Sequence, residues 1–479
     1  MSQAPLILWF RKDLRLGDNP ALHAAVQTGQ PIIPLFILED RATRPLGAAS
    51  AWWLHKSLQA LGARLPLVLR RGAAGAVLED LIAETGAEGV FWNRLYEPDS
   101  IARDSALKAK LQARGLNVQS YAGRYLAPPH SLKNKSGTML KVFTPYWKAL
   151  LAYFETQPLP APLPIPAIGW AQNLPAGEAL ADWQLPPQGP DWSAGLQEEW
   201  TPGEEGAWTR FERFKAFALA SYHGDRNRPD LAKVSRLSAH LHWGEISIGQ
   251  LWHGALLHGN LEDTLANKSH EQFLKELTWR DFSAHLLYHF PALAHQNWRP
   301  EFDAFPWAED TEVLERWQRG QTGYPIVDAG MRELWTTGWM HNRVRMIVAS
   351  FLVKHLLQPW QAGERWFWNT LVDADPATNA ASWQWVAGCG ADAAPYFRIF
   401  NPVTQAEKFD PEGVYIKKWL PELAHLPRQF IAKPWEAPAL VLRAAGVHLG
   451  DTYPAPIISL EQGRARALDA FARLKDSSS

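Results

Sequence analysis

Short apolar runs alternate with helical patterns along the first quarter of the chain. The apolar runs predict buried strands at residues 6–10, 31–38, 65–70, 89–93 and 116–121. The stretches between them have helical periodicity at 48–63, 73–85 and 100–114. This alternation predicts an α/β domain built on a doubly wound parallel sheet. Because no G-x-G-x-x-G follows the first strand, a Rossmann dinucleotide site is not indicated there.

The pattern changes twice further along the chain. Residues 128–202 contain scattered prolines, and in PLPAPLPIP (158–166) almost every second residue is proline, which excludes a helix and favours extended polyproline geometry. From about Trp208 the periodicity is helical, with few strand signals. We therefore expect an α/β domain at 1–127, a long proline-rich linker at 128–202 and a larger all-α domain at 203–479.

Length and composition agree with this organisation. A chain of 479 residues is too long for one core, and 47% hydrophobic with 20% charged residues is typical of soluble globular proteins. No apolar run approaches the roughly 20 residues of a membrane span, and the N-terminus lacks the layout of a signal peptide. The single cysteine, Cys389, excludes an internal disulfide and a thiolate cluster. We expect a cytoplasmic protein without a metal site.

Two further numbers bear on function. The net charge of −1 does not indicate a nucleic-acid binder, so a DNA partner would need a local basic groove. The chain has 25 tryptophans, and eleven of them fall between Trp279 and Trp385. Core packing is the ordinary interpretation of each tryptophan taken singly.

Four long segments carry a specific resemblance. They are WFRKDLRLGDNPAL (9–22), GYPIVDAGMRELWTTGWMHNRVRMIVASFLVK (323–354), GERWFWNTLVDAD (363–375) and WQWVAGCGADAAPYFRIFNPVTQAEKFD (383–410). Together they resemble the photolyase/cryptochrome family over essentially the whole chain. LHWGEIS (241–247) is similar to plant cryptochromes and to the class III bacterial photolyases. The resemblance implies a flavoprotein that binds FAD in its helical domain. It also implies light-driven repair of cyclobutane pyrimidine dimers in UV-damaged DNA, by a monomer that works in the bacterial cytoplasm with the nucleoid.

The resemblance implies a set of FAD contacts: Tyr222, Ser235, Arg236, Leu237, Ser238, Arg345, Asp373, Asp375 and Asn379. The hydroxyls and amides of 235–238 suit a pyrophosphate, although alone they resemble an ordinary helix cap. Arg345 and Asp373 match a family ion pair beside the flavin. Asn379 matches the position that faces flavin N5, where plant cryptochromes carry Asp. A neutral amide there favours repair over signalling.

The implied lesion pocket comes from two helices. Glu276, Trp279 and Arg280 are spaced i, i+3, i+4 and share one face, as do Asn342 and Met346. An isolated E-x-x-W-R pattern usually means a packed tryptophan beneath an ion pair. By resemblance, Glu276 hydrogen-bonds the dimer, and Trp279 and Trp385 stack on it. Enzymes that repair (6-4) photoproducts carry His at both 342 and 346, so Asn and Met favour cyclobutane dimers.

The resemblance also implies an electron relay, basic DNA contacts and an antenna. The relay is Trp383, Trp360 and Trp307, and the DNA contacts are Arg226, Arg280, Arg343, Arg398 and Lys408. Asp99 and Ser100 replace the Asn-Glu of the usual folate site. We expect methenyltetrahydrofolate, bound differently, in preference to a deazaflavin. The alternatives are a cryptochrome-type blue-light receptor, a (6-4) photolyase, and a flavin electron-transfer protein without DNA.

Overall fold

The computed structural model describes residues 3–39, 44–393 and 397–476. The chain packs into two compact units, each discontinuous in sequence. Unit 1 consists of Met1–Ser193, Trp200–Ala220 and Ser235–Pro291, and unit 2 of Ala194–Glu199, Ser221–Val234 and Ala292–Ser479. Because each unit combines separate stretches of the chain, this division does not test the predicted domain boundaries near residues 127 and 202, which stay a prediction.

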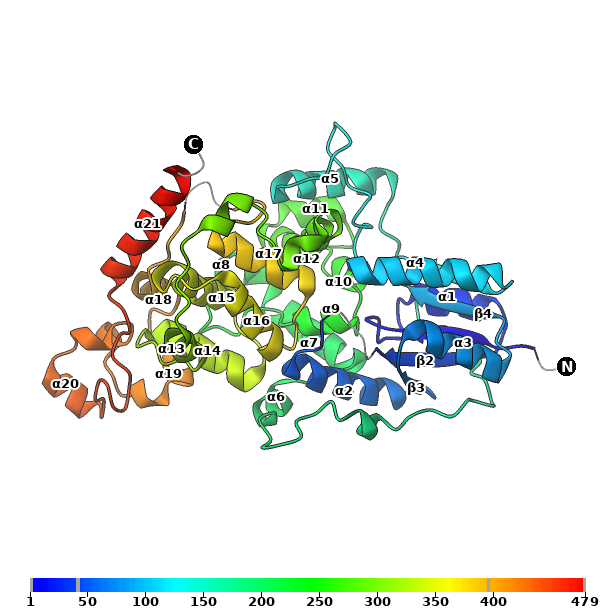
Figure 1. The fold of residues 1–479 in the computed structure, drawn as a ribbon, viewed down its shortest axis with the longest axis horizontal. Helices are drawn as coiled ribbons and strands as arrows, with labels where there is room; N and C mark the ends of the chain where they lie inside the picture. The colour runs from blue at the N-terminus through cyan, green and yellow to red at the C-terminus, as the bar shows by residue number, and fades with distance from the viewer. Residues whose placement is uncertain (1–2, 40–43, 394–396, 477–479) are drawn as a thin grey trace. The chain divides into compact units, whose positions relative to one another are not determined.

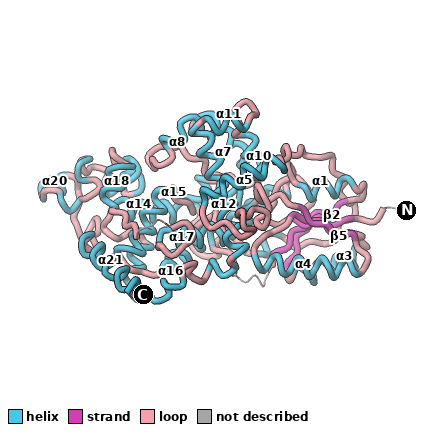
Figure 2. The backbone as a smooth tube through the Cα atoms, turned by 90° about the horizontal axis from the view of Figure 1, so that it is seen from above, coloured by secondary structure: helices cyan, strands magenta, loops and turns pink. Residues whose placement is uncertain are grey.

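A five-stranded parallel sheet organises unit 1. Its order is β3-β2-β1-β4-β5. The strands are β1 (Leu6–Phe10), β2 (Ile32–Leu38), β3 (Val68–Arg71), β4 (Gly89–Asn93) and β5 (Asn117–Tyr121). Helices α1 (Pro20–Gln27), α2 (Ala48–Gly62), α3 (Ala74–Thr85) and α4 (Pro98–Ala113) connect them. Figure 2 shows α1 on one side of the sheet and α3 and α4 on the other. The predicted doubly wound sheet is confirmed.

Both faces of the sheet are buried, which is why its strands are continuously apolar. Leu6 of β1 pairs with Ile32 of β2 on one side and with Gly89 of β4 on the other. Trp9 and Trp92 lie edge to face, with ring centroids 5.9 Å apart. A side chain at Gly89 would meet the Asn117 carbonyl oxygen at 2.7 Å, so the close approach of β4 and β5 requires glycine.

Helices complete unit 1. They are α5 (Phe143–Thr156), α7 (Glu204–Phe217), α9 (Ser238–Trp243), α10 (Ile248–Gly254), α11 (Leu261–Ala266) and α12 (Lys268–His289). Helix α5 lies inside the segment expected to be a connector. Its buried residues Phe143, Tyr146, Trp147, Leu150 and Phe154 have helical spacing, which the surrounding prolines obscured. Residues 158–169 contain neither helix nor strand, as the prolines predicted.

Unit 2 is helical, as predicted (Figure 1). Its longer helices are α13 (Thr311–Gln318), α14 (Pro325–Thr337), α15 (Asn342–Ser350), α16 (Trp360–Thr370), α17 (Pro376–Ala387), α18 (Pro402–Phe409) and α21 (Leu460–Asp476). Shorter ones are α6 (Ala194–Glu199), α8 (Tyr222–Asp225), α19 (Val414–Trp419), α20 (Ala439–Ala444) and a π-helix, Phe351–His355. Helices α14 and α15 approach closely at Gly330. A side-chain carbon added there would lie only 2.5 Å from Val344, so the approach requires glycine.

Neither a membrane-spanning helix nor a metal-binding cluster occurs among the described residues. Within the ranges given above, every helix is too short or too polar to cross a membrane. In the same part of the chain, no group of His, Cys, Asp and Glu side chains is arranged to hold a metal ion.

Asp281 of α12 is a buried acid with an incomplete set of partners. Its Oδ2 accepts from the Leu126 amide at 2.6 Å, and its Oδ1 has no hydrogen-bond partner among the residues that the structure describes. Burial raises its pKa to about 7, against the favourable charge of Arg280. An unfolded aspartate has a pKa of about 4, so the stability contributed by neutral Asp281 is fully present below that pH. This contribution is lost as the pH rises towards 7.

Asp281→Asn should therefore be more stable than the parent protein above pH 7 and nearly equal to it at low pH. Between pH 5.5 and pH 8 the parent should lose about 2 kcal/mol relative to the variant. Urea unfolding of both proteins at the two pH values measures this difference. A difference in stability that does not change with pH would contradict the assignment.

Candidate functional site

Helix α12 holds three of the predicted site residues on one face. The Asn267 side chain begins the helix by accepting from the amides of Ser269 and His270. Glu276 Oε1 accepts from Gln272 Nε2, one turn earlier, at 2.8 Å. This bond orients the Glu276 carboxylate, which is only partly buried.

The indole of Trp279 is fixed by two phenylalanines. Phe143, on α5, stacks on it with ring centroids 3.8 Å apart and an angle of 3° between the planes. Phe282 meets both rings edge-on, at 5.7 Å from Trp279 and 5.9 Å from Phe143. Phe143 thus covers one face of the indole and sets its plane. The opposite face is the one on which a further flat ring can stack.

Arg280 has a structural role in unit 1. It donates to the carbonyl oxygens of Arg124 at 2.9 Å and Leu241 at 3.3 Å. Its guanidinium lies over the Tyr125 ring, 4.8 Å from the centroid. These contacts tie α12 to two other segments of the unit. Its predicted contact with a DNA phosphate stays a prediction.

The predicted phosphate-binding segment of unit 1 has an unusual backbone. Arg236 has a φ of +51°, in the left-handed region that non-glycine residues rarely occupy. Leu237 is buried, and α9 begins at Ser238. Such strained residues concentrate at ligand sites.

In unit 2, Asn379 is oriented by Glu364. Its Nδ2 donates to the Glu364 Oε1 at 2.8 Å and to the Glu364 carbonyl oxygen at 3.1 Å. Both N–H groups of the amide thus donate to Glu364, so Oδ1 is the atom of Asn379 that can accept a hydrogen bond from a ligand. A side chain held in this way presents an acceptor, never a proton donor. Nothing in the sequence pattern pointed to Glu364, fifteen residues before Asn379.

Arg345 and Asp373 form the predicted ion pair. Nη2 of Arg345 lies 3.0 Å from Oδ2 and 3.3 Å from Oδ1 of Asp373. Arg345 Nε donates to the Met340 carbonyl oxygen, and its guanidinium lies over the Trp339 ring. Asp375 begins α17 by accepting from the amides of Ala377 and Thr378. The structure therefore pairs Arg345 with Asp373, and places Asp375 and Asn379 on α17 of the same unit.

Three arginines of unit 2 interact electrostatically. Burial lowers the pKa of the Arg343 guanidinium, and the positive charges of Arg226 and Arg398 lower it further. Arg343 donates to Asn227 Oδ1 at 2.7 Å and lies over the Phe409 ring, which Lys408 also approaches. Like charges held together in this way favour an anion such as a phosphate. Asn342 and Met346 lie on the same helix, one exposed and one half-buried.

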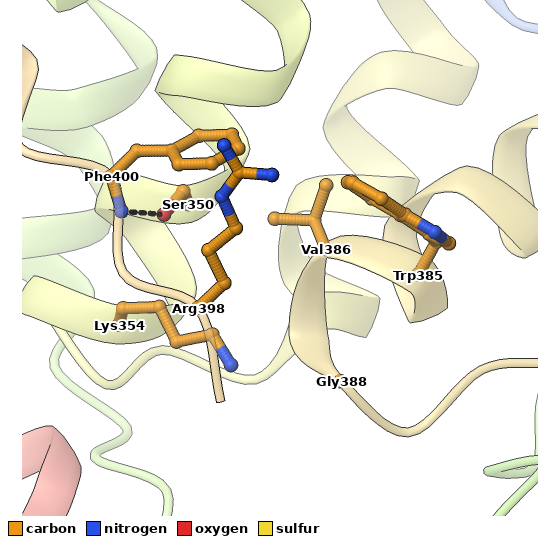
Figure 3. Close-up of a pocket in the computed structure, with 7 residues that line it drawn as sticks. All are labelled: Ser350, Lys354, Trp385, Val386, Gly388, Arg398 and Phe400. Atoms are coloured by element: carbon orange, nitrogen blue, oxygen red, sulfur yellow. Dashed lines mark hydrogen bonds between the residues drawn. The ribbon is translucent and has the colours of Figure 1, made fainter. Parts of the chain in front are cut away.

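A small pocket lies beside Trp385. Its lining also includes Ser350, Lys354, Val386, Gly388, Arg398 and Phe400. Figure 3 shows the Arg398 side chain extending between Phe400 and Val386. Trp385 itself is fixed by a bond from Nε1 to the Asp392 carbonyl oxygen at 3.0 Å. Burial holds the pKa of Lys354 well below its usual range, and its amine donates to the Ala387 carbonyl oxygen.

The predicted relay tryptophans differ in exposure. Trp383 and Trp360 are buried, whereas Trp307 is half-buried and packs on Phe305 at 4.4 Å. Trp317, which sequence reasoning missed, is fully buried and meets Trp383 edge-on at 6.2 Å. No sequence signal separates it from the other tryptophans.

Comparison with known proteins gives the family. Residues 6–165 match the sequence family "DNA photolyase", and residues 273–473 match "FAD binding domain of DNA photolyase". The chain belongs to the photolyase/cryptochrome family. It is 51% identical to a deoxyribodipyrimidine photo-lyase of Agrobacterium fabrum, with 99% of each chain covered. It is 38% identical to Cryptochrome-2 of Arabidopsis thaliana, over 98% of this chain and 79% of the relative.

A solved structure agrees with the sequence relatives. The crystal structure of a bacterial class III photolyase from Agrobacterium tumefaciens has a TM-score of 0.95, at 51% identity, and covers 99% of this chain and 98% of its own. This confirms the predicted architecture of an α/β domain and a helical FAD-binding domain. The unit 2 residues fit a flavin, because an acceptor amide and an Arg–Asp pair complement the polar edge of its ring.

Gly363 of α16 faces the Trp383 ring. A side-chain carbon at this position would lie 2.1 Å from the ring, so Gly363→Ala must displace Trp383. We expect a loss of about 1–3 kcal/mol in stability, seen as a lower melting temperature of the flavin-loaded protein. Gly62→Ala is the matched control, since a side chain there meets nothing within 4 Å. Equal melting temperatures for the two variants would contradict the close contact.

Proposed function

We propose that this chain is a deoxyribodipyrimidine photo-lyase, which uses light to split cyclobutane pyrimidine dimers in DNA. The observation that carries the proposal is its 51% identity, over 99% of both chains, to a protein of that name. When bound, reduced FAD supplies the excited electron that the dimer receives and returns. The other steps depend on the chain's own residues.

The residues of unit 2 hold and tune the cofactor in this proposal. Asn379, fixed by Glu364, accepts a hydrogen bond at the flavin ring and gives it no proton. Arg345 offsets negative charge on the ring, while Asp373 keeps Arg345 in place. Tyr222 and Asp375 are the other FAD contacts proposed in this unit. The segment 235–238, with Arg236 in the left-handed region, is proposed as a phosphate contact in unit 1.

The lesion is held by stacking and by hydrogen bonds. A dimer must leave the duplex, at a cost of a few kcal/mol, before it can be repaired. We assign the face of Trp279 opposite Phe143 and the ring of Trp385 to the dimer, because stacking stabilises each base by about 1–3 kcal/mol. Glu276 accepts hydrogen bonds from the dimer, and Asn342 and Met346 contact it. Neither of the last two moves a proton, as cyclobutane splitting requires.

The arginine cluster supports DNA binding. Arg226, Arg343 and Arg398 concentrate positive charge that a DNA phosphate would neutralise. We also assign Arg280 and Lys408 to contacts with the DNA backbone.

We assign Trp383, Trp360 and Trp307 to the supply of electrons to oxidised FAD. We also propose class III membership, methenyltetrahydrofolate as the antenna, and a monomer in the bacterial cytoplasm with the nucleoid.

A blue-light receptor of the cryptochrome type is the second candidate. Its support is the 38% identity to an Arabidopsis cryptochrome. Asn379 favours repair, because its amide nitrogen is already committed to Glu364 and cannot supply a proton to the flavin.

Illumination of the reduced protein with lesion-carrying oligonucleotides tests the proposal. We expect restored thymines from the cyclobutane dimer and none from the (6-4) product, measured by chromatography. A dark sample is the control. Repair of the (6-4) product alone, or of neither lesion, would overturn the proposed activity.

The Phe143 stack generates a second prediction. Phe143→Leu removes the flat partner of Trp279, so the indole loses its fixed plane. Affinity for dimer-containing DNA should fall about tenfold, or about 1.4 kcal/mol. Affinity for undamaged DNA and FAD content should not change.

Phe154→Leu is the control for this variant. Phe154 lies on the same helix, is equally buried, and packs on Trp252 at 5.3 Å instead. If both variants lose the same affinity for damaged DNA, the stack has no specific role.

A further inference from the structure

Trp360 begins a chain of hydrogen bonds made of side chains. The indole is fully buried, and its Nε1 donates to Asn297 Oδ1 at 2.8 Å. Asn297 Nδ2 in turn donates to Asp303 Oδ1 at 2.6 Å. Asn297 is buried, whereas Asp303 is exposed. The chain thus connects a buried ring to a surface carboxylate through one amide.

Gln384 fixes the position of Asn297. The fully buried Gln384 accepts from the Trp298 amide through Oε1 at 2.8 Å. Its Nε2 donates to the carbonyl oxygens of Gln296 at 2.9 Å and Leu293 at 2.7 Å. Both neighbours of Asn297 are therefore bound by the residue next to Trp383. The amide oxygen that receives the Trp360 N–H has little freedom to move.

We propose that Asn297 is a positioning residue that keeps the indole proton on Trp360 during electron transfer. The inference rests on the relay role of Trp360 proposed above. Once Trp383 had given an electron to a bound, photoexcited flavin, one electron would move from Trp360 to the Trp383 cation radical. Trp383 is restored, and Trp360 becomes the cation radical. Its N–H proton stays in place, and an electron from Trp307 next restores Trp360.

The chemistry of the acceptor explains why the proton stays. An indole that has lost an electron becomes a strong acid, so a carboxylate at its N–H would take the proton. The resulting neutral radical is a weaker oxidant than the cation radical, so it would take an electron from Trp307 less readily and the relay would stop at Trp360. An amide oxygen accepts the hydrogen bond but is too weak a base to take the proton. The Asp303 carboxylate polarises the amide and favours positive charge on Trp360 without touching it.

Exchange of the two side chains tests the inference. In Asn297→Asp/Asp303→Asn the net charge and the number of hydrogen-bonding groups are retained, but the carboxylate now meets the indole. Transient absorption distinguishes the tryptophan cation radical from the neutral radical. We expect the neutral radical, a solvent deuterium isotope effect, and a photoreduction yield lower by about tenfold, since a trap of about 1.4 kcal/mol has that effect.

The controls separate the inference from its premise. Asp303→Asn alone should keep the cation radical and the parent yield within a factor of about two, because the amide remains the acceptor. In the flavin-loaded protein kept in the dark, the Trp360 indole N–H, assigned by its loss in Trp360→Phe, should exchange slowly with solvent, and rapid exchange would contradict its bond to Asn297. A cation radical with the parent's kinetics in the exchanged variant would overturn the role of Asn297. Unchanged photoreduction in Trp360→Phe would instead refute the relay.

Discussion

The buried amide of Gln384 ties two segments of the helical unit together. A buried amide without partners costs about 1–3 kcal/mol, and Gln384 avoids that cost with bonds to three backbone groups. These bonds fasten residues 293–298 to α17. Helix α17 carries Asn379, Trp383 and Trp385, so one set of bonds positions the helix that holds the residues proposed to contact the flavin, relay electrons and stack on the lesion.

Buried polar groups serve two different purposes in this chain. Asp328 is a structural case: its carboxylate accepts from the amides of Thr322 and Gly323, from the Thr322 hydroxyl and from the distant Tyr453 hydroxyl, so both of its oxygens have partners. Arg343 is different, because burial and two neighbouring arginines both disfavour its charge. Asn227 Oδ1 accepts from this half-buried guanidinium, and a bound anion would offset the remaining repulsion. A half-buried cation among like charges is therefore a candidate binding group, whereas Asp328 is a structural one.

The elements of the fold follow from short-range patterns, whereas the partners of the site do not. Strands 6–10 and 89–93 are predicted to the residue, because an apolar run between turns allows little choice. Helix α5 was missed because prolines on both sides hide its periodicity. The stack of Phe143 on Trp279 joins residues 136 positions apart, and no spacing rule reaches that far. The site residues themselves were predicted from family resemblance, and local pattern alone supports packing for each of them.

The tryptophans show why composition cannot assign function. Trp317 and Trp360 are both fully buried, and both donate their indole N–H. Trp317 donates to the Val348 carbonyl oxygen, a backbone group that substitution cannot change. Trp360 donates to a side-chain amide backed by a carboxylate, so both its acceptor and the charge beyond it are set by the sequence. Burial makes a tryptophan part of the core. The fate of its indole proton depends on the basicity of the group that accepts the N–H bond. Of these two rings, only Trp360 has a side-chain acceptor whose basicity a substitution can change.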